Sequence, residues 1–251
     1  EDTDNISVVL WDTGYNQYLN DYIWFIQLAL KQNLKELIVV SNSKERLNTI
    51  KRKCVKIYVD KKDHTQGYNA GKAQAAGDVL IFTTDCALPV EIDTYQELAG
   101  WAKHPEIALV GPKILDFNGK INSLGVILNR ETPVSLFYKE RNEAGRLTYF
   151  GTTSWYRDVN AMDFQCFAIE KKKADELGEL DPQWGILSVV DYCLRARKKY
   201  RNLVDPFAVI KSKDNFTEKI ADGDLNRYHA LFEKYHLPEI DRYGNEEFEE
   251  Y

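Results

Sequence analysis

The 251-residue chain is long enough for one large α/β domain or two small ones, and its composition, 44% hydrophobic and 29% charged, is that of an ordinary globular protein. Its formal net charge of −6, from 33 basic and 39 acidic residues, opposes general attraction to nucleic-acid phosphates or anionic lipid, so we expect no nucleic-acid partner. The four cysteines lie far apart without a C-x-x-C pair, which indicates reduced thiols in a cytosol-like compartment.

The chain contains no run of about 18 apolar residues and no charged-then-apolar leader, so the sequence predicts neither a transmembrane segment nor a signal peptide. These features predict a cytoplasmic location, with the inner face of a membrane as the alternative. Because the chain begins with Glu1 rather than Met, we expect an excised domain or a processed product, which is compatible with other domains in a longer chain.

Strand and helix patterns alternate through the first half of the chain. Buried strands are predicted at 7–11, 37–40, 55–59 and in the apolar run that ends at Asp85. Helices are predicted at 19–30 with Asn20 or Asp21 as the cap, at 44–53, and in the small-residue segment that begins at Gly67. This alternation is typical of a mainly parallel sheet, whose ligand crevice lies beyond the carboxyl ends of the strands. Because Asp12, Ser41 and Asp85 all end apolar strands, we expect them to face one crevice.

The second half has a different pattern. Strands are predicted at 107–110, 113–115 and 126–128, with Asn118-Gly119 as a hairpin turn, and residues 129–158 are predicted to form a long loop. A strand at 164–169 and a helix at 171–177 ending before Gly178 follow. The remaining predictions are a helix at 189–199, extended segments at 202–204 and 207–210, and a helix at 225–235.

Short motifs follow one another in a characteristic order along most of the chain. They are Thr13 with Tyr15-Asn16, Val39-Val40-Ser41-Asn42-Ser43, Asn69-Ala70-Gly71 with Gly77-Asp78, Asp85 to Pro89, Val110-Gly111-Pro112-Lys113, Gly178 to Asp181, Asp191 to Arg197, Pro206-Phe207-Ala208 and Asp241 to Asn245. In this order they resemble the family 2 glycosyltransferases, especially bacterial enzymes that build O-antigen and related polysaccharides. The resemblance implies a single α/β domain of the GT-A fold over 1–245, with a Rossmann-like, mainly parallel central sheet and flanking helices, and an acidic tail at 246–251.

The same resemblance implies the activity and the site. The expected reaction moves a sugar, by inversion, from a nucleotide-sugar donor to a glycan or lipid-linked glycan acceptor. Asp85 would hold a divalent cation, Mn²⁺ or Mg²⁺, against the donor diphosphate. The residues expected to bind the nucleotide-sugar are Asp12, Thr13, Ser41, Asn69, Gly71 and Thr83, and those expected to stack on the acceptor are Trp155 and Trp184. The alternatives are turn chemistry at the strand ends, helix-to-sheet packing for Asn69 and Gly71, and core positions for the two tryptophans.

Several positions depart from the family pattern. Ser41 stands where the family has a carboxylate that accepts a hydrogen bond from the base, and Thr83-Thr84-Asp85 retains only the second acid of the D-x-D pair. Ser212 replaces a histidine between Lys211 and Lys213, where a lysine is able to offset phosphate charge in place of a metal.

The position of the catalytic base is the most serious departure. Val189 occupies it and cannot accept a proton, so Asp191 and Asp163 are the catalytic candidates. The alternatives are an ion pair of Asp191 with Arg195 or a helix cap, and a solvated loop position for Asp163.

These departures leave a second function open, a catalytically degenerate GT-A domain that binds a glycan, a nucleotide or a partner domain. An oxidoreductase is disfavoured because no G-x-G-x-x-G follows the first strand. His64 and His104 lie in polar surroundings and are predicted at the surface.

Overall fold

The computed structural model describes residues 5–130, 135–136, 153–213, 222–239 and 241, and the acidic tail at 246–251 and most of the predicted loop at 129–158 lie outside these ranges. The strands of the main sheet are β1 (Ile6–Asp12), β2 (Leu34–Ser41), β3 (Val55–Tyr58), β4 (Val79–Thr84), β5 (Leu88–Pro89), β6 (Ile107–Leu115), β7 (Ile121–Ser123), β10 (Arg157–Val159), β11 (Cys166–Glu170) and β12 (Arg201–Lys211). Two short strands, β8 (Val126–Ile127) and β9 (Ser135–Leu136), pair separately.

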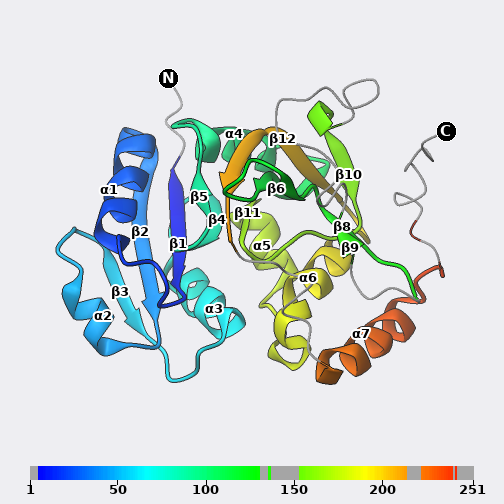
Figure 1. Ribbon diagram of the computed structural model, residues 1–251. Helices are drawn as coiled ribbons and strands as arrows, with labels where there is room; N and C mark the ends of the chain where they lie inside the picture. Colours follow the sequence, from blue (N-terminus) through cyan, green and yellow to red (C-terminus); the bar gives the residue numbers. More distant parts are fainter. Residues whose placement is uncertain (1–4, 131–134, 137–152, 214–221, 240, 242–251) are drawn as a thin grey trace.

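The main sheet has the spatial order β10-β12-β6-β11-β4-β1-β2-β3 (Figure 1). Strands β3, β2, β1 and β4 run parallel to one another, and so do β6 and β12. Strand β11 lies between β4 and β6 and is antiparallel to both. The carboxyl ends of β1, β2, β3, β4, β6 and β12 therefore meet at one edge, as the mainly parallel prediction requires.

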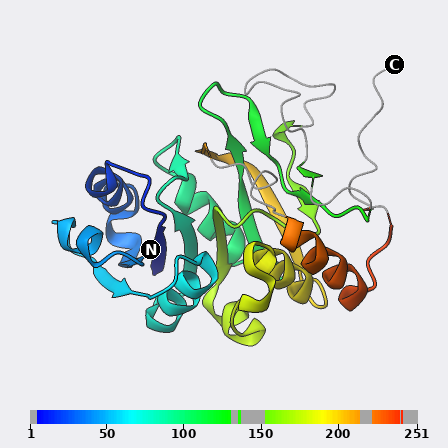
Figure 2. The same ribbon diagram turned by 60° about the horizontal axis from the view of Figure 1, so that its bottom comes forward.

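Helices cover both faces of the sheet. They are α1 (Leu19–Leu30), α2 (Lys44–Thr49), α3 (His64–Gln74), α4 (Thr94–Ala102), α5 (Lys171–Leu177), α6 (Ser188–Ala196) and α7 (Asp222–Tyr235), with 3₁₀ turns η1 (Lys31–Asn33) and η3 (Pro182–Leu187). Figure 2 shows α3, α5, α6 and α7 along one side of the molecule. None of the described helices is long and apolar enough to cross a bilayer.

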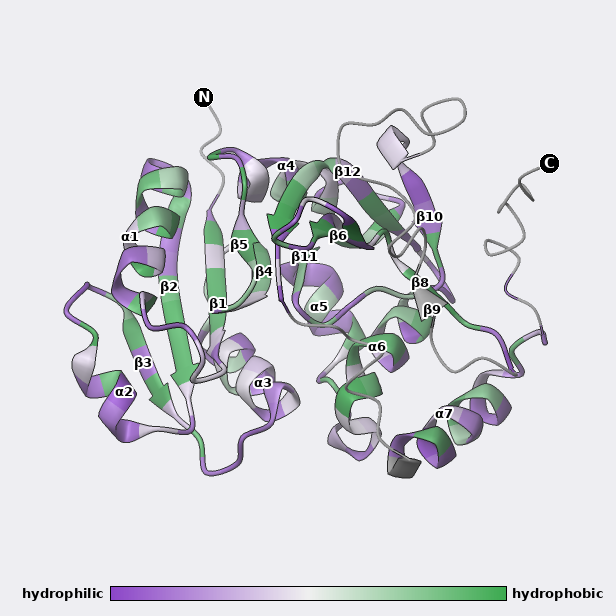
Figure 3. Ribbon diagram, viewed as in Figure 1, coloured by the Kyte–Doolittle hydropathy of each residue, from purple (hydrophilic) through white to green (hydrophobic). Residues whose placement is uncertain are grey.

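Alternating side chains of the central strands enter two separate cores. Val9 and Trp11 of β1 pack in the core that also includes residues of α3, α6 and α7, whereas Val8 and Leu10 pack in the core with α1 and α4. Because successive residues of a strand point to opposite faces, a strand covered on both sides must be apolar throughout. Figure 3 shows this continuous hydrophobic character along the central strands.

The predicted elements are present, but several of their boundaries differ. The helix predicted at 189–199 is α6, which ends at Ala196. The helix at 19–30 matches α1, but neither Asn20 nor Asp21 caps it; the Oδ1 of Asn16 instead accepts a hydrogen bond from the Tyr18 amide at 2.8 Å. The helix predicted at 44–53 ends at Thr49. The segments at 107–110 and 113–115 form one strand, β6, and those at 202–204 and 207–210 form β12, in which a register shift between Asp205 and Val209 accommodates Pro206.

Two predicted turns are confirmed. Gly119, at a φ of +85°, closes the hairpin between β6 and β7, and the amide of Gly119 donates to the Asp116 carbonyl at 3.2 Å. Gly178, at a φ of +79°, ends α5. Both positions lie in the left-handed region that glycine adopts without a steric penalty.

Helix α3 approaches β1 closely because two of its glycines face the strand. A Cβ at Gly67 would lie 2.3 Å from Cε3 of Trp11, and a Cβ at Gly71 would lie 2.2 Å from Cγ1 of Val9. Both distances are far below van der Waals contact, so any side chain at these positions would push the helix off the sheet. At Gly71 the structure therefore shows helix-to-sheet packing, which the sequence offered as the alternative to nucleotide-sugar binding.

We expect the Gly71→Ala variant to lower the free energy of unfolding by about 1–3 kcal/mol, because the added methyl group overpacks the helix-to-sheet interface. Gly100→Ala is the matched control, since Gly100 also lies inside a helix but a Cβ there meets no heavy atom within 4 Å. The control should gain about 0.5–1 kcal/mol from helix propensity. Urea denaturation of both variants measures the difference, and equal effects at the two positions would contradict the close packing.

Candidate functional site at the carboxyl edge of the sheet

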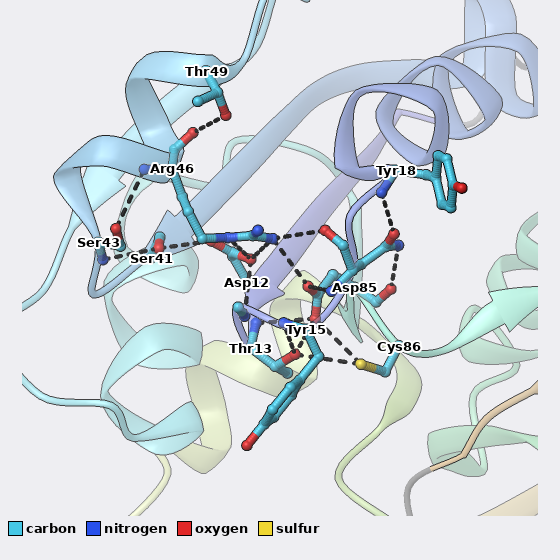
Figure 4. Close-up of polar contacts among 12 residues, drawn as sticks. Asp12, Thr13, Tyr15, Tyr18, Ser41, Ser43, Arg46, Thr49, Asp85 and Cys86 are labelled. Atoms are coloured by element: carbon cyan, nitrogen blue, oxygen red, sulfur yellow. Dashed lines mark hydrogen bonds and ion pairs between the residues drawn. The ribbon is translucent and has the colours of Figure 1, made fainter.

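The carboxyl ends of β1, β2 and β4 bring the predicted strand-end residues together. Asp12 pairs with Ser41 in the β1–β2 register, and the hydroxyl of Ser41 donates to Oδ2 of Asp12 at 2.8 Å. The Oδ1 of Asp85 accepts from the amide of Thr13 at 2.9 Å and from its hydroxyl at 2.5 Å. Figure 4 shows these residues converging on one point. The strand-end residues that the sequence predicts to face one crevice therefore lie together at one edge of the sheet.

Arg46 of α2 joins the two carboxylates of this edge. Its Nε donates to Oδ2 of Asp12 at 2.8 Å and its Nη2 to Oδ1 of Asp12 at 2.6 Å, in the bidentate arrangement typical of strong arginine–carboxylate pairs. Nη2 also lies 3.0 Å from the carbonyl oxygen of Asn16 and 3.5 Å from Oδ2 of Asp85 (Figure 4). Arg46 is not among the site residues predicted from the sequence. Two buried acids at the ends of adjacent strands need a nearby cation. That requirement is the sequence signal that could have identified Arg46, a basic residue shortly after β2.

The two acids have opposite pKa shifts. Burial acts to raise the pKa of Asp12, but the hydrogen bonds from Arg46 and Ser41 and the guanidinium charge outweigh it and hold this pKa below its usual value. Burial raises the pKa of Asp85, and the bonds from Thr13 and Asn16 offset only part of that effect. Asp12 is therefore the partner that ion pairing with Arg46 keeps charged.

The surroundings of Asp85 do not fit a divalent cation as they stand. Its side chain is 0% exposed, Oδ1 accepts two hydrogen bonds from Thr13, and Oδ2 accepts one from the Asn16 amide at 3.2 Å. Hard cations need several oxygen ligands, and within the described ranges no group of three or more His, Cys, Asp or Glu residues is placed to hold a metal ion. The guanidinium of Arg46, 3.5 Å from Oδ2, already occupies the position of a counter-charge.

Asp191 lies in α6 and is committed to ion pairs. Its side chain is 0% exposed, and Oδ2 accepts from Nε of Arg195 at 2.9 Å. Oδ1 accepts from Nζ of Lys234 and from the hydroxyl of Tyr235, both at 2.7 Å. The ion pair with Arg195 that the sequence offered as the alternative is present, and the carboxylate also connects α6 to α7.

Asp163 and His64 are both buried more deeply than the sequence predicts. Asp163 is 3% exposed and accepts hydrogen bonds from the amide and the side-chain nitrogen of Gln165, both at 2.9 Å, so it is not a solvated loop acid. The ring of His64 lies 4.6 Å from that of Phe164, and its Nε2 lies 3.2 Å from the hydroxyl of Ser188. The side chain of His64 is only 11% exposed, so the surface prediction for it is wrong, whereas His104 is exposed.

Other predicted site residues are further from this edge or serve packing. Asn69 exchanges two hydrogen bonds with the backbone of Leu180, at 2.8 and 2.9 Å, and so fixes the segment before η3. Thr83 is fully buried within β4, with its hydroxyl 3.4 Å from that of Tyr22. Trp184 is 7% exposed and belongs to a core, whereas Trp155 is 52% exposed. Only Trp155 of the two tryptophans presents a free ring face to solvent.

No protein-family model matches the chain. Among curated proteins, O-antigen biosynthesis protein RfbC of Myxococcus xanthus is 26% identical over 161 residues, and the uncharacterized protein y4gI of Sinorhizobium fredii is 25% identical over 189 residues. These matches include 60% and 69% of this chain but only 12% and 20% of the two relatives. The chain thus spans a small part of the curated relatives that it matches.

Solved structures are similar over nearly the whole chain. GalNAc-T7 with UDP, GalNAc and Mn²⁺ has a TM-score of 0.67 at 16% identity, over 93% of this chain and 50% of that one. Glucosyl-3-phosphoglycerate synthase from Mycobacterium tuberculosis, with Mn²⁺, UDP and phosphoglyceric acid, has a TM-score of 0.57 at 12% identity over 94% and 80%. Mannosyltransferase PcManGT from Pyrobaculum calidifontis, with GDP-Man and Mn²⁺, has 0.54 at 14% over 93% and 62%. The chain has a GT-A glycosyltransferase-like fold, as its motifs predict.

We expect Asp12→Asn to destabilise the protein at neutral pH by about 1–3 kcal/mol, because the charge-assisted bonds with Arg46 are lost. The pKa of Asp12 is lowered on folding, so the stabilisation from its ionised form is complete above the unfolded value near 3.8 and is lost as the pH falls through the folded pKa. Urea denaturation across this range should show the variant converging on the parent in acid. Asp21→Asn, an exposed charge change on α1, is the control, and a pH-independent difference for Asp12→Asn would contradict the ion pair.

Asp191→Ala should lower the free energy of unfolding by about 2–4 kcal/mol, since it leaves Arg195 and Lys234 without their buried partner, although both cations are partly exposed. Asp175→Ala, which removes an exposed pair with Lys171, is the control and should cost less than about 1 kcal/mol. Thermal and urea denaturation measure both. If Asp191→Ala lowers the free energy of unfolding by no more than the control does, the contacts of Asp191 with α7 do not stabilise the protein.

Proposed function

We propose that this GT-A domain is a glycosyltransferase that moves a sugar from a nucleotide-sugar donor to a glycan acceptor. The observation that carries the proposal is the meeting of Thr13, Ser41 and the two buried acids at the carboxyl edge of one parallel sheet, where ligands of open α/β sheets bind. The three compared structures each contain a nucleotide or a nucleotide-sugar together with Mn²⁺, which supports a donor of this class. The similarity to RfbC supports a polysaccharide such as O-antigen as the acceptor class.

The proposed donor sits over the ends of β1, β2 and β4. Thr13, Ser41 and Asp12 provide hydroxyl and carboxylate groups for the nucleoside, and the diphosphate lies towards Asp85. A divalent cation at Asp85 stays a prediction, and no step of the proposed reaction passes through it, because the surroundings of this carboxylate do not fit one. A cytoplasmic location, or one at the inner face of a membrane, likewise stays a prediction.

The proposed reaction inverts the anomeric carbon. The acceptor hydroxyl oxygen forms a bond to that carbon while the bond from the carbon to the diphosphate breaks, and the electron pair leaves with the nucleoside diphosphate. The hydroxyl proton passes to a carboxylate. Both carboxylates are buried, but Asp163 is the better candidate, because Asp191 is held by the cations Arg195 and Lys234, whereas Asp163 accepts hydrogen bonds from the neutral Gln165. Trp155, with an exposed ring, is the candidate for stacking on the acceptor.

A second function has its own support in the structure. Val189 is 1% exposed at the position where the resemblance expects the base, and Asp191 is held in ion pairs. Since general-base help contributes about 10²–10⁴ in rate, a domain that has lost it entirely would bind its ligand without useful turnover. The second candidate is therefore a degenerate GT-A domain that recognises a nucleotide, a glycan or a partner domain.

Calorimetric titration with a panel of sugar nucleotides, followed by a donor-hydrolysis assay, separates the two functions. We expect donor binding, and a loss of about 10²–10⁴ in turnover in Asp163→Asn with binding retained. Asp158→Asn, which alters only a surface pair with Arg201, is the control and should match the parent. Binding without turnover in the parent would favour the degenerate domain, and no heat with any donor would exclude both donor-based functions.

A further inference from the structure

Two lysines follow strand ends at the carboxyl edge, in addition to Arg46. Lys44, at the start of α2, places Nζ 4.6 Å from the ring centroid of Tyr58, and Lys62, after β3, places Nζ 4.6 Å from that of Tyr15. Neither lysine has a carboxylate partner in the part of the chain that the structure describes. Lys44 follows β2 and Lys62 follows β3, so both lie on the edge of the sheet where ligands of such folds bind.

Arg46 retains unused donor capacity. A guanidinium has five N–H groups, and here Nε and Nη2 are directed at Asp12, Asp85 and the Asn16 carbonyl. Its Nη1 makes no hydrogen bond to any described residue, and the side chain is 27% exposed. The two buried acids therefore fix the plane of the guanidinium and leave one of its amino groups available to a ligand.

The cation predicted from the D-x-D block has a specific task, which is to offset the charge of the leaving diphosphate. A fixed guanidinium performs the same task, and its planar fork matches phosphate oxygens better than a lysine does. Its orientation costs little on binding, because Asp12 already holds it with two charge-assisted bonds.

We propose that Arg46 takes the place of the metal at this site, with Asp12 and Asp85 orienting its guanidinium so that Nη1 binds the diphosphate of the nucleotide. This inference rests on the proposed donor binding and identifies a group that donates hydrogen bonds to the diphosphate of that donor. Lys62 lies close enough to the exposed ring of Tyr15 to assist at the mouth of the site. Nucleotide affinity is then independent of divalent cations and dependent on Arg46.

Isothermal titration of the whole chain with UDP and with GDP, once in excess EDTA and once in MnCl₂, tests the inference. We expect the same dissociation constant in both buffers for whichever nucleotide binds. Arg46→Gln should weaken nucleotide binding by about 10- to 100-fold, because it removes the charge-assisted hydrogen bonds from the guanidinium to the diphosphate. Arg52→Gln is the matched control, since Arg52 lies near the ring of Trp24 on the outer side of α1, and it should bind as the parent does.

The double variant Asp12→Asn/Arg46→Gln guards against misfolding, because it removes the buried charge together with its partner. If Arg46 only neutralises Asp12, the double variant binds as tightly as Asp12→Asn alone, and the inference fails. If Arg46 binds the diphosphate, the double variant binds more weakly than Asp12→Asn. Binding that requires Mn²⁺ also overturns it, while leaving the proposed glycosyltransferase function intact. No binding in either buffer would overturn both. Thermal denaturation of each variant confirms that weakened binding does not reflect unfolding.

Discussion

The burial of two carboxylates at adjacent strand ends is the constraint around which this edge of the molecule is built. A carboxylate without solvent contact is costly unless its oxygens are bonded, and Asp85 meets that need with backbone and hydroxyl donors from the β1–α1 loop. Asp12 meets it with Ser41 and with Arg46 from α2. These contacts fix the loop after β1 and the start of α2 in relation to β4, so the shape of the site depends on charge compensation as much as on packing.

The sequence predicts the first half of the fold well because its signals are local. The period of α1 and the apolar run of β1 identify those elements almost to the residue. The predicted caps Asn20 and Asp21 lie inside α1, whose N-cap residue is Tyr18 and has no side-chain cap bond. Because of their prolines, the sequence predicts β6 and β12 each as two separate strands. Pro112 and Pro206 lack a backbone donor, which normally argues against a continuous strand, but both lie at the register shift of the β6–β12 pairing. A bulge of that kind depends on the neighbouring strand and leaves no local pattern.

The candidate site was predictable in its location but not in its electrostatics. Strand-end positions alone place Asp12, Ser41 and Asp85 together, because parallel strands share one carboxyl edge. The local pair of Asp191 with Arg195 is visible in the sequence, but its second oxygen is held by Lys234 and Tyr235, which approach from α7 more than forty residues later. The polar neighbours of His64 in the sequence predict a surface position, but the ring of Phe164, one hundred residues away in the chain, packs against it. Contacts between distant segments decide the chemistry of each group.

The position of β11 has a consequence for how the chain assembles. Strand β4 is complete at Thr84, yet its neighbour on that side is not the next long strand but β11, which begins at Cys166. A nascent chain therefore carries β4 with an unpaired, apolar edge until the later segment arrives, and such edges are prone to associate with other chains. Long-range pairing of this kind also slows folding. The first half is expected to need protection during synthesis until the strand from the second half inserts and seals the sheet.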